Sequence, residues 1–242
     1  NRFDNLIAVS ENTKRDIITL AGVPENKVRV IYSGVNKIYR HFDIQSGEDN
    51  QVLEKVRTKY NLPENFILYV GNLEPRKNIN GLIEAFSLQA DRGLAGFKLV
   101  VAGGIGWRAQ EIHEAAVRSP FKDRLVFLGY IDEVDKPALY NLAAVLAYPS
   151  FYEGFGFPPL EAMACGTPVI TSAVSSLPEI VGDAGILVDP YNLSAIAEAL
   201  SLVISDSHLR QVMSNKGLEQ AAKFSWYRAA KEYLAYFTGN SH

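Results

Sequence analysis

Residues 66–86 read FILYVGNLEPRKNINGLIEAF, and this stretch decides the fold. Residues 66–70 form a short and continuously apolar run, which is typical of a parallel strand covered on both faces. Four apolar residues near the end share one face of a helix, namely Ile79, Leu82, Ile83 and Phe86. Asn78 stands just before this helix as the expected N-cap. A strand that leads through a short loop into a helix is the repeating unit of an α/β fold.

The alternation of short apolar runs and helical spacing continues along the chain. Strands are predicted at Phe66–Val70, Phe97–Ala102, Leu125–Leu128, Val145–Tyr148, Val169–Thr171 and Ile186–Val188. From Asn192 onward the strand signal ends, and helices are predicted at Leu193–Ile204, Ser207–Ala222 and Tyr227–Phe237. The chain is therefore expected to be an α/β protein with a Rossmann-like, doubly wound parallel sheet and a helical C-terminus.

The beginning of the chain has a pattern of its own. Leu6–Val9 and Val28–Tyr32 predict two strands. Between them, Ser10 is the expected N-cap of a helix that runs to about Leu20. Residues 1–40 therefore resemble a strand–helix–strand unit that remains from a preceding domain.

A polar stretch separates this unit from the rest. Residues 41–50 contain Gly47 and no periodicity, so they are expected to be a linker. Residues 51–242 are then expected to form the ligand-binding domain. Because the chain begins at Asn1 without an initiator methionine, a processed product or a fragment of a longer protein is expected.

Composition excludes several classes of protein. The 242 residues carry 24 basic and 27 acidic side chains, so no broad basic surface is available for a nucleic-acid backbone. No apolar run approaches the roughly 20 residues of a membrane-spanning helix. The single cysteine, Cys165, favours a reducing compartment, and a cytoplasmic location is expected. The histidines lack the spacing of metal ligands and are His41, His113, His208 and His242.

The loop after the strand at residues 66–70 carries two adjacent cations. Arg76 and Lys77 directly precede the predicted helix N-terminus. Fixed positive charges beside oriented N–H groups suit a diphosphate, which needs charge neutralisation and several donors. The alternative is a solvated pair of cations on a surface turn.

A second loop favours a different ligand. Gly104, Gly106 and Ala109 match the G-x-G-x-x-A form of the dinucleotide fingerprint, after a strand and before a helix. The fingerprint expects an acidic residue at the end of the next strand, but Leu125–Leu128 is followed by Gly129 instead. An NAD-dependent oxidoreductase and a tight strand-to-helix turn both remain open from these glycines.

The richest loop spans residues 150–168, which read SFYEGFGFPPLEAMACGTP. Its two glycines bracket Phe155, and two prolines then open a helix, which together suit a cradle for a polar ligand. Glu153 and Glu161 lie eight residues apart. If the loop folds back tightly, both carboxylates face one cleft, where they would bind the hydroxyl groups of a ribose or a hexose.

Together these segments resemble the retaining glycosyltransferases of family 4. The similarity rests on residues 153–170, 70–78, 8–13 and 31–36. This family has the GT-B fold, in which two Rossmann-like domains face a cleft and the C-terminal one holds a nucleotide sugar. The resemblance implies that this chain is that C-terminal half, preceded by the end of the first domain.

The resemblance also assigns roles to particular residues. Arg76 and Lys77 would hold the donor diphosphate, Glu153 the donor sugar, and Glu161 the ribose. Glu153, Arg76 and Lys77 are thereby the expected catalytic residues. Further substrate contacts are implied for Gly71, Tyr130, Ile131, Gly154, Phe155, Gly156 and Phe157, with the base near Tyr130 and Ile131.

The expected activity follows from the same resemblance. A hexose would pass from a nucleotide sugar to a glycan or a lipid-linked acceptor, with retention and with no metal or cofactor. UDP-glucose is favoured as the donor, and GDP-mannose remains open. The preceding domain would be needed for transfer, and the full-length enzyme would work in the cytoplasm or at the cytoplasmic face of a membrane. The remaining alternative is a non-catalytic module that binds nucleotide sugars.

Overall fold

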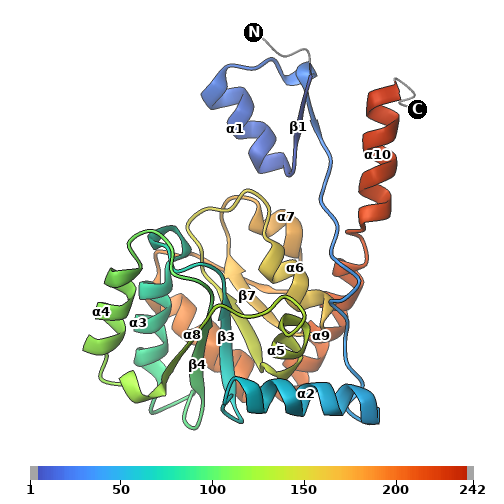
Figure 1. Ribbon diagram of the computed structural model, residues 1–242. Coiled ribbons are helices and arrows are strands. Elements are labelled where there is room, and N and C mark those ends of the chain that lie inside the picture. The colour runs from blue at the N-terminus through green and yellow to red at the C-terminus, as the bar shows by residue number, and fades with distance from the viewer. Residues whose placement is uncertain (1–4, 239–242) are drawn as a thin grey trace.

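The six predicted strands form one parallel sheet in the computed structural model, which describes residues 5–238 (Figure 1). The strand order is β5-β4-β3-β6-β7-β8. The strands are β3 (Phe66–Val70), β4 (Lys98–Ala102), β5 (Leu125–Gly129), β6 (Val145–Tyr148), β7 (Val169–Ser172) and β8 (Ile186–Val188). Each neighbouring pair is parallel, so the prediction of a doubly wound parallel sheet is confirmed. Residues 1–4 of the expected N-terminal unit, and His242, lie outside the described residues.

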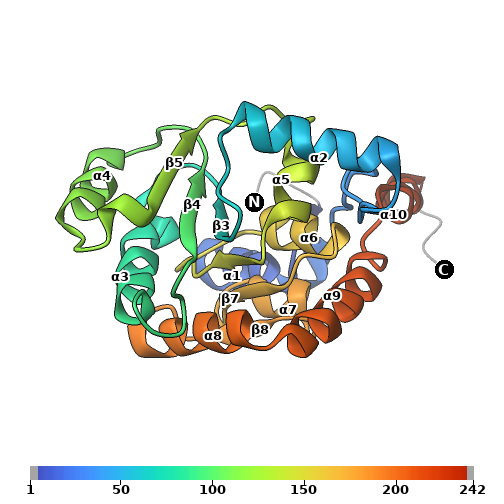
Figure 2. The ribbon, with the colours of Figure 1, turned by 90° about the horizontal axis from the view of Figure 1, so that it is seen from below.

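Helices cover both faces of this sheet (Figure 2). One layer contains α3 (Ile79–Gln89), α4 (Ala109–Arg118) and α8 (Leu193–Ser205), and α3 contacts both of the others. The opposite layer contains α2 (Gly47–Lys59), α5 (Lys136–Leu142), α6 (Phe157–Ala164) and α9 (Ser207–Ala221). Because both faces are covered, every residue of β3, β6 and β7 is buried, which explains the apolar sequences of β3 and β6 and the apolar start of β7.

A second, smaller sheet stands apart from the first. It pairs β1 (Leu6–Ala8) with β2 (Val28–Val30) in parallel, and α1 (Glu11–Ala21) connects them. The predicted cap is confirmed, because the Ser10 side chain accepts a hydrogen bond from the Thr13 amide.

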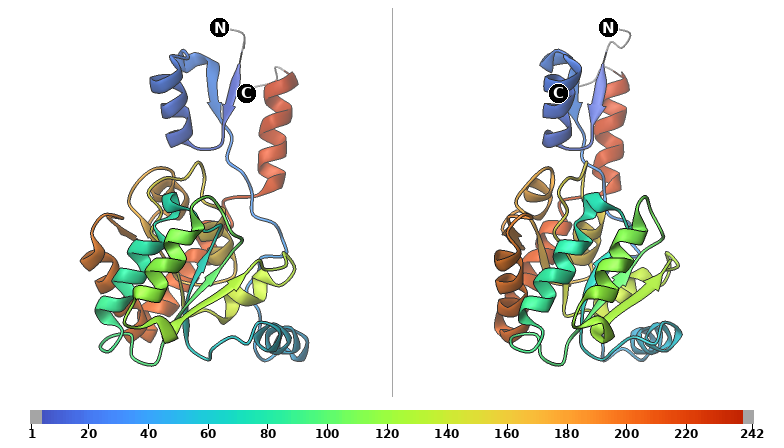
Figure 3. Two further views of the ribbon diagram at one scale, coloured as in Figure 1. Left: turned by 60° about the vertical axis from the view of Figure 1, so that its left-hand side comes forward. Right: turned by 90° about the vertical axis from the view of Figure 1, so that its left-hand side faces the viewer.

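The C-terminal helix α10 (Trp226–Thr238) returns to this small sheet and lies beside it in both views of Figure 3. The chain therefore crosses between the two parts twice. The crossings are joined where the Val35 amide donates to the Phe224 carbonyl at 3.1 Å, and Val35 forms a bridge with Ser225.

The expected linker at residues 41–50 is partly wrong. Helix α2 begins at Gly47, so the end of that stretch is helical. Asp49, in its first turn, is buried and pairs with Arg40 at 2.5 Å. The helix buries Leu53 and Val56 among many charged residues, which gives too weak a period to be recognised in the sequence. The short helix α7 (Leu177–Val181) was also not predicted.

Within the described residues, no helix has both the length and the apolar character needed to cross a membrane.

Candidate functional site

The order of the main sheet reverses between β3 and β6. Loops that leave the carboxyl ends of two such strands diverge, and the crevice between them is where open α/β sheets bind ligands. The two loops here are residues 71–78 and 149–156. They are joined where the Phe151 amide donates to the Arg76 carbonyl oxygen at 2.9 Å. The candidate site is built from these two loops.

Five side chains from these loops and the end of β6 form what we call the charged cluster, namely Arg76, Lys77, Tyr148, Ser150 and Glu153. Oxygen Oε1 of Glu153 accepts from Lys77 Nζ at 2.6 Å, from Ser150 Oγ at 2.7 Å and from Tyr148 Oη at 2.9 Å. Oxygen Oε2 of Glu153 accepts from Arg76 Nη1 at 3.0 Å. The cluster thus brings together the two cations and the acid that the sequence singled out.

Burial and pairing set the charges of this cluster. Burial by itself would raise the pKa of Glu153, but the Lys77 charge, its hydrogen bonds and Arg76 outweigh burial, so this pKa is lowered. Burial lowers the pKa of Lys77, and the nearby Glu153 carboxylate opposes part of that change. Glu153 is therefore a firmly ionised acceptor, whereas the charge of Lys77 depends on its partners.

Arg76 is the more accessible of the two cations. Its side chain is 42% exposed, whereas that of Lys77 is 11% exposed. Arg76 also pairs with Glu74 at 3.3 Å and donates to the Tyr152 carbonyl oxygen at 2.7 Å. An arriving anion would therefore compete with carboxylates for both cations.

Asn78 has a different role from the predicted one. It lies at the expected position before α3, but its φ of 56° is left-handed, and its side chain does not cap the helix. The side-chain amide instead donates to the carbonyl oxygens of Pro149 at 3.0 Å and Pro190 at 2.8 Å. Asn78 therefore ties the loop after β3 to the loop after β6. A sequence pattern for N-caps does not distinguish an asparagine with this role from one that caps a helix.

The glycine-rich segment between Glu153 and α6 is held by the N-terminal part of the chain. The Gly154 carbonyl oxygen accepts from the hydroxyl groups of Ser10 at 2.7 Å and Thr13 at 3.0 Å. Gly156 has a φ of 121° and directly precedes α6. The Phe155 side chain is buried and its carbonyl oxygen accepts from Ser176 Oγ at 2.7 Å, whereas the Phe157 side chain is exposed.

Glu161 lies one turn inside α6 and has its own partners. Its Oε2 accepts from Tyr140 Oη at 2.8 Å. Burial raises the pKa of Glu161, and hydrogen bonding from Tyr140 opposes part of that increase. Glu153 and Glu161 are thus held by different groups, and their environments shift their pKa values in opposite directions.

The loops after β3 and β5 complete the edge of the sheet. Gly71 follows β3 with a φ of 152°, and its amide donates to the Ala102 carbonyl oxygen at 2.9 Å. Tyr130 is 74% exposed, whereas Ile131 is buried. A ligand at this edge would meet the Tyr130 ring and the backbone of Ile131.

Residues 103–106, which we call the glycine loop, are packed by the neighbouring loop. A Cβ at Gly103 would lie 1.9 Å from the Gly71 carbonyl oxygen. A Cβ at Gly106 would lie 2.9 Å from the Leu73 carbonyl oxygen, and the Leu73 amide donates to Gly104 at 3.0 Å. Close backbone packing thus accounts for Gly103 and Gly106, whereas a Cβ at Gly104 would meet its nearest neighbour, Asn72, at 3.6 Å. The packing at Gly106 favours the tight-turn interpretation over the dinucleotide fingerprint.

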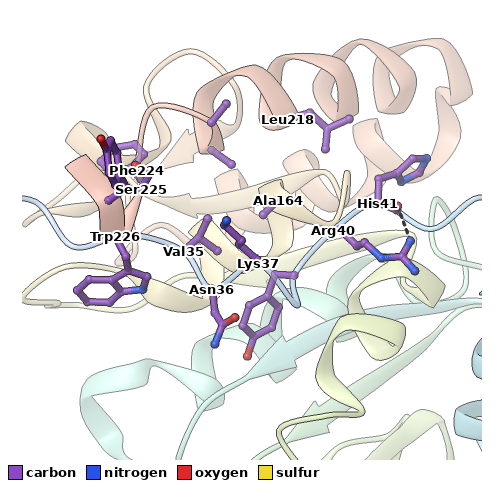
Figure 4. Close-up of a pocket in the computed structure, with 14 residues that line it drawn as sticks. Val35, Asn36, Lys37, Arg40, His41, Ala164, Leu218, Phe224, Ser225 and Trp226 are labelled. Carbon is purple, nitrogen blue, oxygen red and sulfur yellow. Dashed lines mark hydrogen bonds between the residues drawn. The ribbon is translucent and has the colours of Figure 1, made fainter. Parts of the chain in front are cut away.

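A large cavity of the described residues does not coincide with the charged cluster. It measures about 670 Å³ and lies where the chain crosses between the two parts, with Lys37 and Trp226 on its wall (Figure 4). No member of the charged cluster lines it. We assign the site to the charged cluster, because it combines buried ionised groups with the position at which such sheets bind ligands.

Three polar residues of the site were not predicted. Tyr148 and Ser150 belong to the charged cluster, and Tyr140 holds Glu161. Tyr148 and Tyr140 appear in the sequence as members of apolar patterns, but a buried phenol needs a hydrogen-bond partner, which is a usable signal. Within residues 5–238, no group of three or more His, Cys, Asp or Glu side chains is placed to hold a metal ion.

Two family models match this chain. The model described as glycosyl transferases group 1 matches residues 52–220. The model described as glycosyltransferase family 4 matches residues 1–37.

Among named relatives, O-antigen chain mannosyltransferase B of Escherichia coli is 36% identical over 91% of this chain and 57% of its own length. The serotype-specific mannosyltransferase WbdA of Escherichia coli is 31% identical over 98% of this chain and 29% of its own length. The chain therefore spans between 29% and 57% of the length of these relatives.

Solved structures have the same architecture. Sucrose-phosphate synthase from Thermosynechococcus elongatus superposes with a TM-score of 0.80 at 28% identity, over 96% of this chain and 57% of that one. HepE from Anabaena, solved in complex with UDP-glucose, has a TM-score of 0.86 at 23% identity, over 99% of this chain and 65% of that one. The second likeness concerns the fold alone.

Proposed function

Since this chain belongs to the family of glycosyl transferases group 1, we propose that it is the donor-binding half of a retaining hexosyltransferase. The observation that carries the proposal is the pair of cations, Arg76 and Lys77, which meets Glu153 at the switch point of the sheet. The proposed ligand is a nucleoside diphosphate hexose, because its diphosphate matches the cations and its hydroxyl groups match the carboxylates.

The cations would act on the leaving group. Breaking the bond between sugar and phosphate builds negative charge on the nucleoside diphosphate. Arg76, Lys77 and the first amide groups of α3 would stabilise that charge in a fixed geometry. In this proposal they carry the positive charge that a divalent metal supplies in other transferases.

Glu153 would position the donor sugar. Its Oε1 already accepts three hydrogen bonds, whereas its Oε2 accepts one from Arg76, which leaves Oε2 to receive a sugar hydroxyl. The lowered pKa keeps this carboxylate ionised but makes it a weak base. These contacts support a positioning role for Glu153.

Glu161 would bind the ribose. Its carboxylate is held by Tyr140, and it lies on α6 directly after the glycine-rich segment. Tyr130 and Ile131 would contact the base, and the backbone of residues 154–156 would contact the sugar. Gly71 would allow the diphosphate to approach the loop after β3.

Two donors remain to be compared. UDP-glucose was favoured from the sequence, whereas the two mannosyltransferases named above support a mannosyl donor such as GDP-mannose. We propose a glycan or a lipid-linked sugar as the acceptor and a preceding domain as the partner that presents it. We propose that the full-length enzyme is cytoplasmic and that it can associate peripherally with a membrane.

Binding measurements test this proposal directly. The chain is titrated calorimetrically with UDP, GDP, UDP-glucose, GDP-mannose and NAD. We expect one nucleoside diphosphate to bind, and at about 100 times its dissociation constant to stabilise the fold by about 2.7 kcal/mol. Binding of NAD without binding of UDP or GDP would instead support the oxidoreductase.

Transfer activity separates the enzyme from a non-catalytic module. We expect the chain alone to transfer almost no sugar, because positioning of two substrates contributes about 7–11 kcal/mol to such a rate enhancement. A chain extended to the length of the relatives should transfer hexose to a glycan acceptor. If the extended chain binds the donor and transfers to no acceptor in a broad panel, the non-catalytic module is the better description.

A further inference from the structure

The hydroxyl group of Tyr148 lies between the two opposite charges of the cluster. Lys77 Nζ donates to Tyr148 Oη at 2.6 Å, and Tyr148 Oη donates to Glu153 Oε1 at 2.9 Å. Lys77 Nζ also donates to that same carboxylate oxygen at 2.6 Å. The three groups therefore close a small ring of hydrogen bonds.

The phenol is fixed in this place. Tyr148 is 1% exposed and ends the wholly buried strand β6. Its ring stacks on that of Tyr69, with centroids 5.7 Å apart and an angle of 15° between the planes. Burial raises the pKa of Tyr148 well above its ordinary value, so the phenol keeps its proton. Its single proton points to Glu153, and a lone pair receives Lys77.

This arrangement sets the direction of the lysine. An ammonium group has three N–H bonds. Among the described residues, two of them are taken by Tyr148 and Glu153, which leaves one for a ligand. Without the phenol oxygen, the Lys77 ammonium would be held by the carboxylate alone and would be free to turn about that contact.

We propose that Tyr148 is a positioning residue, which fixes the Lys77 ammonium so that its remaining N–H bond meets a phosphate oxygen of the donor. The inference rests on the function proposed above. It adds a residue that acts through Lys77 and touches no atom of the donor. Its effect should therefore depend on the phosphates and on Lys77.

The first test removes the hydroxyl and keeps the ring. UDP and GDP, with uridine and guanosine as their phosphate-free counterparts, are titrated into the wild-type chain and into Tyr148→Phe. We expect affinity for the nucleoside diphosphate to fall about tenfold, as for loss of a hydrogen bond to a charged group, and nucleoside affinity to be unchanged. Tyr69→Phe is the matched control, because it removes a phenol from the stacked partner ring, whose hydroxyl donates to the Asn72 carbonyl oxygen at 3.4 Å.

The second test asks whether Tyr148 acts through Lys77. In a double-mutant cycle, Tyr148→Phe should have almost no further effect on diphosphate affinity in a Lys77→Ala background. The pH dependence gives an independent readout. The phenol oxygen stabilises the charged ammonium, so its loss should lower the pKa of Lys77 further and move the alkaline decline of diphosphate binding to lower pH. Tyr69→Phe should leave that decline in place.

The outcomes separate the two proposals. A wild-type chain that binds neither UDP nor GDP overturns the proposed function and this inference with it. If the wild-type chain binds UDP or GDP, three results would each overturn the inference alone. These are equal losses of diphosphate affinity in Tyr148→Phe and Tyr69→Phe, additive effects in the double-mutant cycle, and an alkaline decline of binding that Tyr148→Phe does not move. If Tyr148→Phe does not fold, Tyr148→Met supplies a second phenol-free variant with a flexible apolar side chain, and the same results are expected.

Discussion

The charged cluster and the glycine loop lie at the same edge of one sheet. Both belong to the same local pattern, in which a loop connects a strand to a helix. Each follows a buried strand, and each leads into a helix. In the charged cluster, the oppositely charged Lys77 and Glu153 are held in the interior at hydrogen-bond distance. In the glycine loop, backbone from the neighbouring loop lies against Gly103 and Gly106, where a side chain would have no room. Glycines in a strand-to-helix loop therefore indicate a close approach, and the structure decides whether a ligand or the chain itself approaches.

The largest effect is expected where a buried charge loses its partner. Lys77→Ala leaves the Glu153 carboxylate buried and less compensated, so the free energy of unfolding should fall by about 3–5 kcal/mol. Affinity for UDP or GDP should fall about ten- to a hundredfold. Urea denaturation and calorimetry measure the two losses. Lys59→Ala is the control, because Lys59 also pairs with two carboxylates but is exposed, and about 0–1 kcal/mol is expected there.

A substitution in the glycine loop should damage the fold where the backbone of the neighbouring loop is close. Gly103→Ala would place its Cβ against the Gly71 carbonyl oxygen, so a loss of about 2–3 kcal/mol in unfolding free energy is expected. Gly104→Ala is the matched control, because its Cβ meets its nearest neighbour, Asn72, at 3.6 Å. Thermal denaturation compares the two. A Gly104→Ala variant that is as unstable as Gly103→Ala would contradict the packing explanation.

The accessible cation should affect the ligand more than the fold. Arg76→Ala should lower affinity for the nucleoside diphosphate about tenfold, with a change in stability of about 1 kcal/mol or less, because Arg76 is partly exposed. Arg108→Ala makes the same change beside the glycine loop, where Arg108 pairs with Glu111. Calorimetry with UDP and GDP should register the first substitution alone. Equal losses in both variants would show that general electrostatic attraction, and no placed contact, accounts for binding.

The smallest expected effect is on the pH dependence of stability, and it distinguishes Glu161 from Glu153. Burial raises the pKa of Glu161, so the fold is favoured by its protonated form, and that contribution is lost as pH rises through the raised pKa. Glu161→Gln should therefore stabilise the fold at neutral pH and remove this part of the pH dependence. The same variant should weaken binding of uridine and UDP alike, since both contain ribose.

The pH dependence of Glu161→Gln is measured by urea denaturation between acid and neutral pH. Glu198→Gln, on the exposed face of α8, is the control and should match the wild type. The lowered pKa of Glu153 has the opposite consequence: its contribution is present at neutral pH and is lost as pH falls through the lowered value. A Glu161→Gln variant that is less stable than the wild type at neutral pH would contradict the argument that burial disfavours the ionised form of this carboxyl.

The strands could be predicted from the sequence because each is a short apolar run that both helical layers cover. Helix α2 could not, because it buries few apolar side chains and is otherwise charged. The role of Asn78 was misread because its left-handed φ depends on contacts with Pro149 and Pro190, which are distant in sequence. Position along the chain identified Arg76 and Lys77 as candidates. Their pairing with Glu153 depends on the contact between the loops at residues 71–78 and 149–156. Spacing along the sequence does not determine that contact.

The paired crossings between the two sheets have a consequence for synthesis. Strands β1 and β2 leave the ribosome well before α10, which lies beside them (Figure 3). The bond between Val35 and Phe224 joins the same early and late segments. Contacts between such distant segments close large loops and form slowly, so the N-terminal unit gains its contact with α10 only after the main sheet has been made. A ribosome stalled before Trp226 should therefore carry a folded main sheet and an N-terminal unit that is still open to proteases.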